Sequence, residues 1–426
     1  MSAAMSVSPS MNRKTLMKLL AAALFFKAFI TPAHGGDSVR SQVMATLAPV
    51  PQRIEAVEVY GVPVNAERRF SYEVQKNRWH LFIRFTSGDK SGWTEMNLGQ
   101  GEPDLTLEKR AWRLKWFGQL KGRTPAEAIG FFQENRDKLD RGSLEAAEMA
   151  VLDLAGKLLG KPAAEILTLS KDAPVPGLFC ILSDDPEKVK AEARRSLEQN
   201  LRTHLKVKLY GRTETDTAVV RAAREVMGPQ AYIGGDVNMG YRHALSDASV
   251  DDIVTAMLAL RDAGLNACED PGQMSNAQWA EVQRRVSPMS LIPDEPLRPA
   301  WKSRLSLDPA MGGIYNMHPN CMGSLIETVE LGRVIQRAGK KLMVGDSSLV
   351  GPACPVWQQV AIGLGADWVE ALEKPQENDV FQRCVKRNPV NRAPDGKFAL
   401  LERLPGFGVE MDLPKLKELS AGMLSL

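Results

Sequence analysis

Two lysines, Lys206 and Lys208, lie in a stretch of the chain where apolar and polar residues alternate. Alternation with a period of two predicts a β-strand and directs both lysine side chains to the same face. Two ammonium groups this close repel each other, so each should lower the pKa of the other. A fold accepts this cost where it needs an amine that takes up a proton near neutral pH. The pair is therefore either a general acid–base group or part of a solvated edge strand.

Further along the chain, polar residues close a series of short apolar segments at intervals of about one strand–helix unit. With the second lysine they are Lys208, Asp236, Glu269, Asp294, His318, Asp346 and Glu370. In a closed parallel barrel the C-terminal ends of all strands meet around one mouth. Three successive carboxylates would then repel one another, and a hard divalent cation relieves this, with all-oxygen ligands favouring Mg²⁺ or Mn²⁺. Helix capping by each carboxylate is the alternative, and it explains one such residue better than three in register.

The segments between these residues predict the elements that position them. Short apolar strands alternate with amphipathic helices from residue 174 onward. Strand–helix repetition predicts a parallel sheet of the α/β class, and eight such units predict a closed (β/α)8 TIM barrel. The expected strands cover residues 177–182, 205–209, 231–236, 267–269, 291–294, 314–318, 342–346 and 368–370.

An α+β unit is expected before the barrel. Residues 54–62 and 79–86 have strand patterns and are joined by a polar loop at 65–77. Helical patterns follow, and the third of them is expected to begin at Ser143 as N-cap. The expected domains are therefore 45–172 for the α+β unit, 173–400 for the barrel and 401–426 for a C-terminal segment.

Composition limits the classes of partner. The net charge is +3 and no basic run is present, so we do not expect a nucleic-acid partner. The five cysteines are widely spaced without a Cys-x-x-Cys pair, so neither a disulfide framework nor a zinc site is expected.

The N-terminus has the layout of a secretory signal peptide over residues 1–36. Basic residues up to Lys18 precede an apolar run at 19–26, and small residues follow from Ala33. This predicts an exported protein, periplasmic or secreted. The run is too short for a stable membrane span. Lys27 interrupts it, and the alternative is a cytoplasmic protein with an overlong start, or an organelle transit peptide.

Four motifs in chain order resemble the signature of the enolase superfamily, in its mandelate racemase and muconate lactonizing enzyme branch. They are Lys206-Val207-Lys208, Asp236-Val237-Asn238, Cys268-Glu269-Asp270-Pro271 and Pro293-Asp294-Glu295. The stretch 146–157 is similar to the last helix of the N-terminal capping domain of that branch. The resemblance covers about 50–400 and implies a barrel with an α+β capping domain.

The resemblance also implies roles for single residues. Asp236, Glu269 and Asp294 would bind Mg²⁺, and Lys208 would be the base that removes the proton α to a substrate carboxylate. Lys206 would hold that carboxylate and keep the pKa of Lys208 low. Supporting roles fall to Asn238 at the metal, Glu295 as partner of a lysine, Glu370 as donor to the enolate and the capping loop at 65–77 as lid.

His318 departs from the pattern of the branch, which usually has a lysine base at the end of the sixth strand. Our hypothesis is that His318 is the base or acid on the opposite face and that Asp346 orients it. The competing interpretation is that His318 only forms a hydrogen bond with the substrate. Two bases predict a racemase or epimerase that acts on a small carboxylate. The resemblance also implies a homo-oligomer, which is common in the family. Single-base β-elimination (an acid dehydratase), a cycloisomerase, or an exported pseudoenzyme that only binds a ligand are the alternatives.

Overall fold

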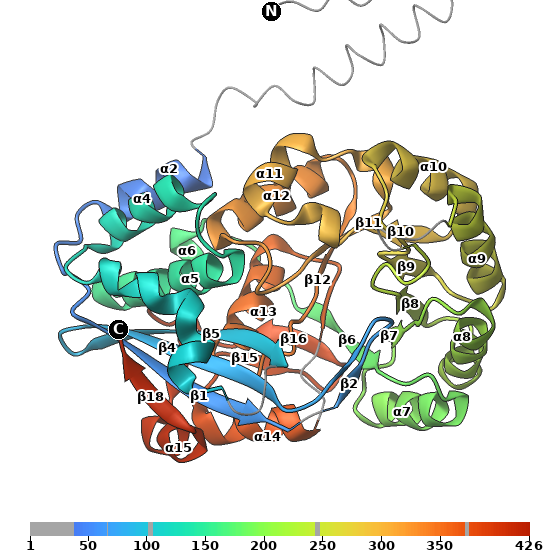
Figure 1. The fold of residues 1–426 in the computed structure, drawn as a ribbon. Helices are drawn as coiled ribbons and strands as arrows, with labels where there is room; N and C mark the ends of the chain where they lie inside the picture. The colour runs from blue at the N-terminus through green and yellow to red at the C-terminus, as the bar shows by residue number, and fades with distance from the viewer. Residues whose placement is uncertain (1–37, 66, 101–104, 243–247, 371–374) are drawn as a thin grey trace, which may run out of the picture. The chain divides into compact units, whose positions relative to one another are not determined.

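Short parallel strands, each followed by a helix, form the larger part of the computed structural model, which describes residues 38–426 except 66, 101–104, 243–247 and 371–374 (Figure 1). The predicted leader, 1–36, lies outside the described residues. The spatial order β10-β9-β8-β7-β6-β13-β12-β11 is that of a (β/α)8 barrel, so the predicted fold class is confirmed. In chain order the strands are β6 (Val175–Ile181), β7 (His204–Lys208), β8 (Tyr232–Asp236), β9 (Ala267–Glu269), β10 (Ser290–Ile292), β11 (Ile314–Met317), β12 (Lys341–Val344) and β13 (Trp368–Glu370).

The ring of strands closes between β10 and β11, the two ends of this order. The backbone N–H of Asn316 on β11 donates to the carbonyl of Pro293, just after β10, at 3.1 Å. Side chains alternate between the barrel interior and the layer beneath the helices. The interior is plugged by a separate apolar cluster of Leu178, Ala267, Ile292, Ile314, Met343 and Trp368. The opposite, C-terminal ends of the strands are thereby left for polar groups.

Amphipathic helices cover the outside of the barrel. Side-chain caps start several of them: Ser249 caps α9 by accepting from the N–H of Asp252, whose side chain bonds back to Ser249. The helices between the strands are α7 (Pro186–Glu198), α8 (Thr213–Met227), α9 (Val250–Asp262), α10 (Asn276–Val286), α11 (Ala300–Ser306), α12 (Leu325–Arg337) and α13 (Ala353–Leu364), with short 3₁₀ turns η2 (Glu295–Leu297) and η3 (Pro309–Met311).

An antiparallel sheet and a layer of helices form the capping domain. The sheet order is β18-β1-β4-β5, with β1 (Ala56–Val64), β4 (Arg78–Ser87), β5 (Lys90–Gln100) and β18 (Gly422–Ser425). Strand β5 packs directly on helix α5 (Arg141–Leu159): a Cβ at Gly92 would come within 2.1 Å of the Ala150 carbonyl, so only glycine fits there. The other helices are α2 (Val39–Leu47), α3 (Leu107–Arg110), η1 (Ala111–Leu120), α4 (Pro125–Asn135) and α6 (Ala163–Ile166).

One expectation for this domain is corrected. Helix α5 begins at Arg141 and its N-cap is Asp140, which accepts from the N–H of Ser143 at 3.0 Å, so the predicted N-cap Ser143 is wrong. The C-terminal segment also returns to the capping sheet, because β18 pairs antiparallel with β1. The chain from the barrel to this strand forms α14 (Pro375–Cys384), β14 (Val385–Arg387), β15 (Val390–Arg392), β16 (Lys397–Leu400), β17 (Glu410–Met411) and α15 (Leu413–Leu419).

The polar loop expected at 65–77 is a small hairpin of β2 (Arg68–Arg69) and β3 (Val74–Gln75). Its turn reaches β7 of the barrel, where the Phe70 ring centroid lies 5.1 Å from the Lys208 ammonium. No helix among the described residues is long and apolar enough to cross a membrane.

Candidate active site

Lys208 ends β7 and points into the mouth of the barrel. The register of the parallel strands places it next to Asp236, the last residue of β8, and its ammonium contacts the Asp236 carboxylate. It also donates to the Asn238 side-chain oxygen at 2.9 Å. Asn238 has a positive φ of 47° and its N–H donates to Asp236 at 3.0 Å, so a tight turn after β8 holds both groups around the lysine.

Lys206 lies two residues before Lys208 on β7, so its side chain points to the same face from deeper in the barrel. Its ammonium contacts the Glu370 carboxylate at the end of β13, and it lies 3.4 Å from Glu269. Burial lowers the pKa of each lysine, but the carboxylates outweigh burial and hold the pKa of Lys206 well above its usual value and raise that of Lys208. The expected net lowering by mutual repulsion is therefore wrong for this structure: the nearby negative charges are stronger than the second lysine.

The three predicted metal ligands converge at the ends of β8, β9 and β10. Asp236, Glu269 and Asp294 are each no more than 2% exposed. Burial, and then the charge of Asp236, raises the pKa of Glu269 well above its usual value. The Asp294 carboxylate adds to this effect, because a second negative charge nearby disfavours ionisation of Glu269.

Other cations and donors complete the surroundings of these carboxylates. The guanidinium of Arg298 donates to both carboxylate oxygens of Asp294, with Nε at 3.0 Å from Oδ1. The side-chain N–H of Asn316 donates to Glu269 at 2.8 Å. Burial raises the pKa of Asp294, but Arg298 and then His318 outweigh it and lower it to about 2. The Asn316 side-chain oxygen is buried and has no hydrogen-bond partner among the residues that the structure describes. This oxygen is a further possible acceptor beside the Glu269 carboxylate.

The donor set can be tested against a divalent cation. Over the described ranges, no group of three His, Cys, Asp or Glu side chains is already arranged around one point as a metal site. The chemistry of the residues nevertheless fits: three buried carboxylates lie on neighbouring strands, and the charges of Asp236 and Asp294 both raise the pKa of Glu269. Carboxylate oxygens are the ligands that Mg²⁺ and Mn²⁺ prefer. Lys208 and Arg298 contact two of them and would have to withdraw.

His318 follows β11 on the other side of the ring. Its Nδ1 lies 2.9 Å from the Pro319 carbonyl. Burial lowers the pKa of His318, but the charge of Asp294 outweighs burial and raises it to about 10. A carbonyl only accepts, so Nδ1 carries a proton and Nε2 is the nitrogen left for substrate.

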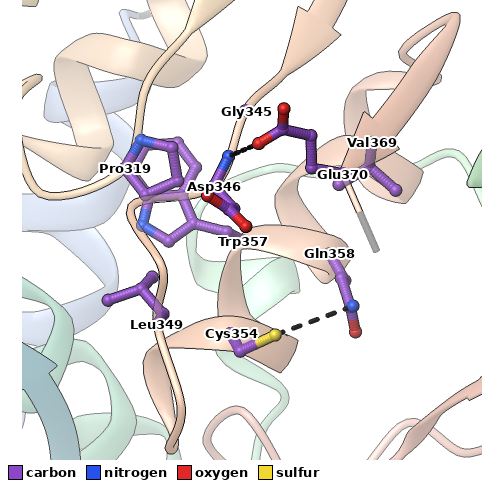
Figure 2. Close-up of a pocket in the computed structure, with 9 residues that line it drawn as sticks. All are labelled: Pro319, Gly345, Asp346, Leu349, Cys354, Trp357, Gln358, Val369 and Glu370. Carbon is purple, nitrogen blue, oxygen red and sulfur yellow. Dashed lines mark hydrogen bonds between the residues drawn. The ribbon is translucent and has the colours of Figure 1, made fainter. Parts of the chain in front are cut away.

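The structure does not pair His318 with Asp346. Asp346 follows β12, and its carboxylate lies 3.8 Å from Arg68 of the hairpin and accepts from the N–H of Ser348 at 2.9 Å. Its own N–H donates to Glu370 at 2.7 Å. Figure 2 shows this bond at one wall of a pocket lined by Pro319, Gly345, Asp346, Leu349, Cys354, Trp357, Gln358, Val369 and Glu370. The predicted orienting carboxylate therefore faces the hairpin and this pocket.

The hairpin β2–β3 closes over the lysine side of the mouth. The ring of Phe70 lies 5.1 Å from the Lys208 ammonium, and Ser71 reaches the Asn238 carbonyl at 3.5 Å. Arg68 is buried beside Asp346, whereas Arg69 pairs at the surface with Asp184 in the loop after β6, at 3.1 Å. Two consecutive arginines thus attach the hairpin to two different barrel loops.

Glu295 does not have the expected partner. Its side chain is exposed, and in the described part of the chain it forms no ion pair with a lysine. The acidic residue that supports this turn is Asp270, which accepts from the N–H groups of Asp294 and Glu295 at 3.1 Å each. Burial, and then the charge of Asp294, raises the pKa of Asp270 to about 8.

Sequence reasoning missed several groups at the mouth. Asn316 lies two residues before His318, so strand alternation was a usable signal for its inward position. Arg298 reaches Asp294 only because the turn η2 folds the chain back, and the sequence contains no signal for that. Cys180 on β6 stands in register with Lys206, which the alternation of β6 could have indicated.

Comparison with known proteins agrees with this arrangement. A family model described as "Enolase C-terminal domain-like" matches residues 188–416. The chain is 29% identical to an L-Lys-D/L-Arg epimerase from Methylococcus capsulatus, over 51% of this chain and 59% of that protein. It is 26% identical to an N-succinylamino acid racemase from Thermus thermophilus and 24% identical to muconate cycloisomerase 1 from Acinetobacter baylyi. These alignments cover 63% and 64% of this chain and 68% and 71% of the relatives.

Solved structures share the fold at low identity. The dipeptide epimerase from Cytophaga hutchinsonii, solved with Mg and the dipeptide D-Ala-L-Val, has a TM-score of 0.73 and 16% identity, covering 88% of this chain and 99% of that one. The N-succinyl Arg/Lys racemase from Bacillus cereus has a TM-score of 0.72 and 19% identity, covering 88% and 100%. The family model covers more than half of the chain, and the motifs, barrel and capping domain agree with it. The chain is therefore an enzyme of the enolase superfamily, in its mandelate racemase and muconate lactonizing enzyme branch.

Proposed function

We propose that the enzyme is a racemase or epimerase that removes the proton α to a substrate carboxylate and returns a proton to the opposite face. The observation that carries this proposal is the position of Lys208 and His318. Their strands, β7 and β11, lie four places apart in the ring of eight, so the two side chains approach the mouth from opposite sides. The three carboxylates lie on the strands between them, β8, β9 and β10.

In this proposal each residue acts on a stated proton. Lys208, as the neutral amine, takes the α-proton on one face and becomes an ammonium, which donates to Asn238. His318 delivers a proton from Nε2 on the other face, while its Nδ1–H remains on Pro319. The roles exchange in the reverse direction, as microscopic reversibility requires. Lys206, fixed by Glu370, contributes positive charge beside the substrate carboxylate.

Asp236, Glu269 and Asp294 would hold a divalent cation. Such a cation would stabilise the negative charge that develops on the substrate as the proton leaves, and it would cancel the carboxylate charges that raise the pKa values of Lys208 and His318. The capping hairpin contributes by excluding water, because Phe70 covers the Lys208 ammonium.

The test is α-proton exchange in D₂O with Mg²⁺, monitored by ¹H NMR. Substrates are N-acyl amino acids, dipeptides and hydroxy acids, each in both configurations. The wild type should exchange both configurations of one class. His318→Asn should lose exchange of one configuration, and Lys208→Ala that of the other, by about 100-fold or more.

A matched control tests whether the effect belongs to the mouth. His204→Asn makes the same substitution at the opposite end of the barrel, where His204 stacks on Trp368 at 4.8 Å between ring centroids. It should leave both exchange rates within about twofold of wild type. Equal rates in His318→Asn and wild type would end the two-base proposal.

A single-base reaction is the second candidate, and the absence of a His318–Asp346 pair favours it. Lys208 alone would then support β-elimination of water, or a cycloisomerisation of the kind named for the muconate relatives. Net product without exchange of the second configuration would identify this case. Stoichiometric substrate binding without exchange or product would instead indicate a ligand-binding protein that has lost activity.

The domain limits and the leader are also proposals. We infer a capping domain over 45–172, a barrel over 173–400 and a C-terminal segment over 401–426. We further propose export on residues 1–36, as periplasmic or secreted protein. Mass spectrometry of the protein isolated from its native host would test this: a mature chain beginning near residue 37 is expected, and a peptide from residues 1–36 in the isolated protein would contradict it.

A further inference from the structure

Glu145 of the capping helix α5 is a buried carboxylate outside the mouth, and its hydrogen bonds within the described part of the chain all go to the barrel. It is 2% exposed. It accepts from the N–H groups of Asn320, of Met322 at 2.8 Å and of Gly323 at 3.1 Å. All three belong to the loop that leaves β11 directly after His318. A single side chain of the capping domain therefore determines the path of this loop.

The first of these bonds connects to His318 through one peptide group. The carbonyl of Pro319 and the N–H of Asn320 are the two ends of the same planar peptide. Glu145 accepts from its N–H, and the carbonyl faces Nδ1 of His318 at 2.9 Å. Above about pH 7, where Glu145 is ionised, its negative charge at the N–H end polarises the peptide and strengthens the carbonyl as acceptor.

The backbone here is held in an unfavourable conformation. Asn320 has a φ of 64°, in the left-handed region that costs a non-glycine residue energy. Its side chain is fixed as well, since Nδ2 donates to the Asn97 carbonyl of β5 at 3.0 Å. The capping domain thus holds both the N–H and the side chain of Asn320, and the peptide cannot rotate without breaking these bonds.

We propose that Glu145 is the positioning residue of His318, acting through the Pro319–Asn320 peptide to fix the Nδ1–H tautomer and direct Nε2 at the substrate. In this proposal Glu145, and not Asp346 as the sequence suggested, is the carboxylate that orients His318. The inference rests on the proposed function, in which His318 serves one face of the substrate.

Glu148 provides a matched control one helical turn further along α5. It is equally buried and also accepts from barrel groups, the hydroxyl of Ser324 at 2.8 Å and the N–H of Ile326 at 3.0 Å. These groups begin helix α12, and Glu148 does not contact the peptide that holds His318. Glu145→Gln and Glu148→Gln therefore remove the same charge from the same helix at different distances from the histidine.

The experiment measures α-proton exchange of both configurations with the full-length enzyme and Mg²⁺. The His318 configuration is defined as the one that His318→Asn no longer exchanges. Glu145→Gln should slow that configuration about tenfold and the other by less than about twofold, whereas Glu148→Gln should change both by the same factor. In the His318→Asn background, Glu145→Gln should have no further effect on the remaining configuration.

A second readout does not depend on turnover. ¹⁵N NMR of the histidines reports which ring nitrogen carries the proton, and Glu145→Gln should lose the Nδ1–H signature of His318 while Glu148→Gln retains it. If Glu145→Gln does not fold, Glu145→Asp keeps the charge but withdraws it by one methylene, and the same selective loss is expected.

An unchanged ratio of the two exchange rates in Glu145→Gln, with Nδ1–H retained, would overturn the inference. Failure of the proposed function has a different signature, because His318→Asn itself would then leave both configurations unchanged.

Discussion

Single buried carboxylates are the main chemical feature of this enzyme at the residue scale. Some face the mouth, and others join the capping domain to the barrel by accepting backbone N–H groups. Glu95 of β5 accepts from Val350 and Gly351 at 2.7 Å each, and Glu145 accepts from the loop after β11. Burial of such groups has a consequence for stability that depends on pH.

Stability should fall as pH rises through the ionisation of Glu145. Burial raises the pKa of Glu145 from 4.5 to about 7 in the folded protein, against the opposing effect of its backbone donors and of His318. Between these two pH values the folded protein binds more protons at this site than the unfolded chain does. By linkage, the free energy of unfolding therefore falls as pH rises through this range, by about 3 kcal/mol in total.

Urea unfolding of the wild type and Glu145→Gln at pH 5 and pH 7.5 would measure this contribution. The glutamine variant does not ionise, so its stability relative to wild type should improve between the two pH values. Glu134→Gln, at an exposed position on α4, controls for loss of a carboxylate. A stability difference between wild type and Glu145→Gln that is the same at both pH values would contradict the argument.

Much of the mouth could be predicted from residue spacing, and the reason is geometrical. Parallel strands of similar length bring their last residues together, so Lys208, Asp236 and Glu269 are neighbours by register. The direction of the lysine pKa values could not be predicted, because it depends on which charge lies closest in space. The contacts of Arg298 and Asp346 depend on turns and on the hairpin, which the sequence pattern does not determine. The catalytic and metal-binding roles stay predictions.

At the element scale, the hairpin β2–β3 connects the capping domain to the mouth. It is short, and a two-stranded hairpin has little stability of its own. What fixes it are its contacts with the barrel, above all Arg68, whose side chain is 5% exposed and lies beside Asp346. Local opening of such an element requires only that these contacts break.

Arg68→Met should therefore increase opening of the hairpin. The substitution retains the bulk of the side chain but leaves Asp346 without this cation, and about tenfold more opening corresponds to about 1.4 kcal/mol. Limited proteolysis with chymotrypsin, which can cleave after Phe70 and Tyr72, measures the opening. Cleavage there should be about tenfold faster than in wild type.

Arg53→Met is the control for that experiment. Arg53 also pairs with a carboxylate, Glu127 at 3.0 Å, but both side chains are about half exposed, at 55% and 49%. Exposed pairs contribute little, so its cleavage pattern should match the wild type. Equal cleavage after Phe70 in Arg68→Met and wild type would show that the ion pair does not hold the hairpin.

The barrel strands and helices were predictable because each is a local pattern. Short apolar strands and helices alternate from unit to unit, and the family model confirms the resulting fold. The start of α5 was not predictable in detail, since Asp140 and Ser143 are both good N-cap residues. Packing decides between them: Ser143 is buried, and its hydroxyl accepts from Trp116 at 3.2 Å.

At the scale of the whole molecule, the capping domain is assembled from both ends of the described chain. Strand β18 at the C-terminus pairs with β1, and α2 at the other end packs near α12, where Arg40 pairs with Glu327 at 3.0 Å. Such pairings join residues hundreds of positions apart, so local sequence patterns contain no trace of them. They explain why the domain limits read from the sequence omit β18 from the capping sheet.

A divalent cation at the mouth should stabilise the entire molecule. Its three proposed ligands belong to three different strands, so the unfolded chain cannot present them together. Ligand at 100 times its Kd adds about 2.7 kcal/mol to the free energy of unfolding. The melting temperature of protein treated with EDTA should therefore rise when Mg²⁺ is added.

Arg298 makes that prediction specific. It is the cation on Asp294 in this structure, and breaking a buried pair costs about 3 kcal/mol because one charge is left without a partner. Arg298→Met should therefore melt well below wild type in EDTA and recover more of its stability with Mg²⁺. Arg285→Met, which removes an arginine paired at the surface with Asp251 at 2.7 Å, should gain as much from Mg²⁺ as wild type does. If Arg298→Met gains no more from Mg²⁺ than these two proteins, Arg298 and the metal do not compete for Asp294.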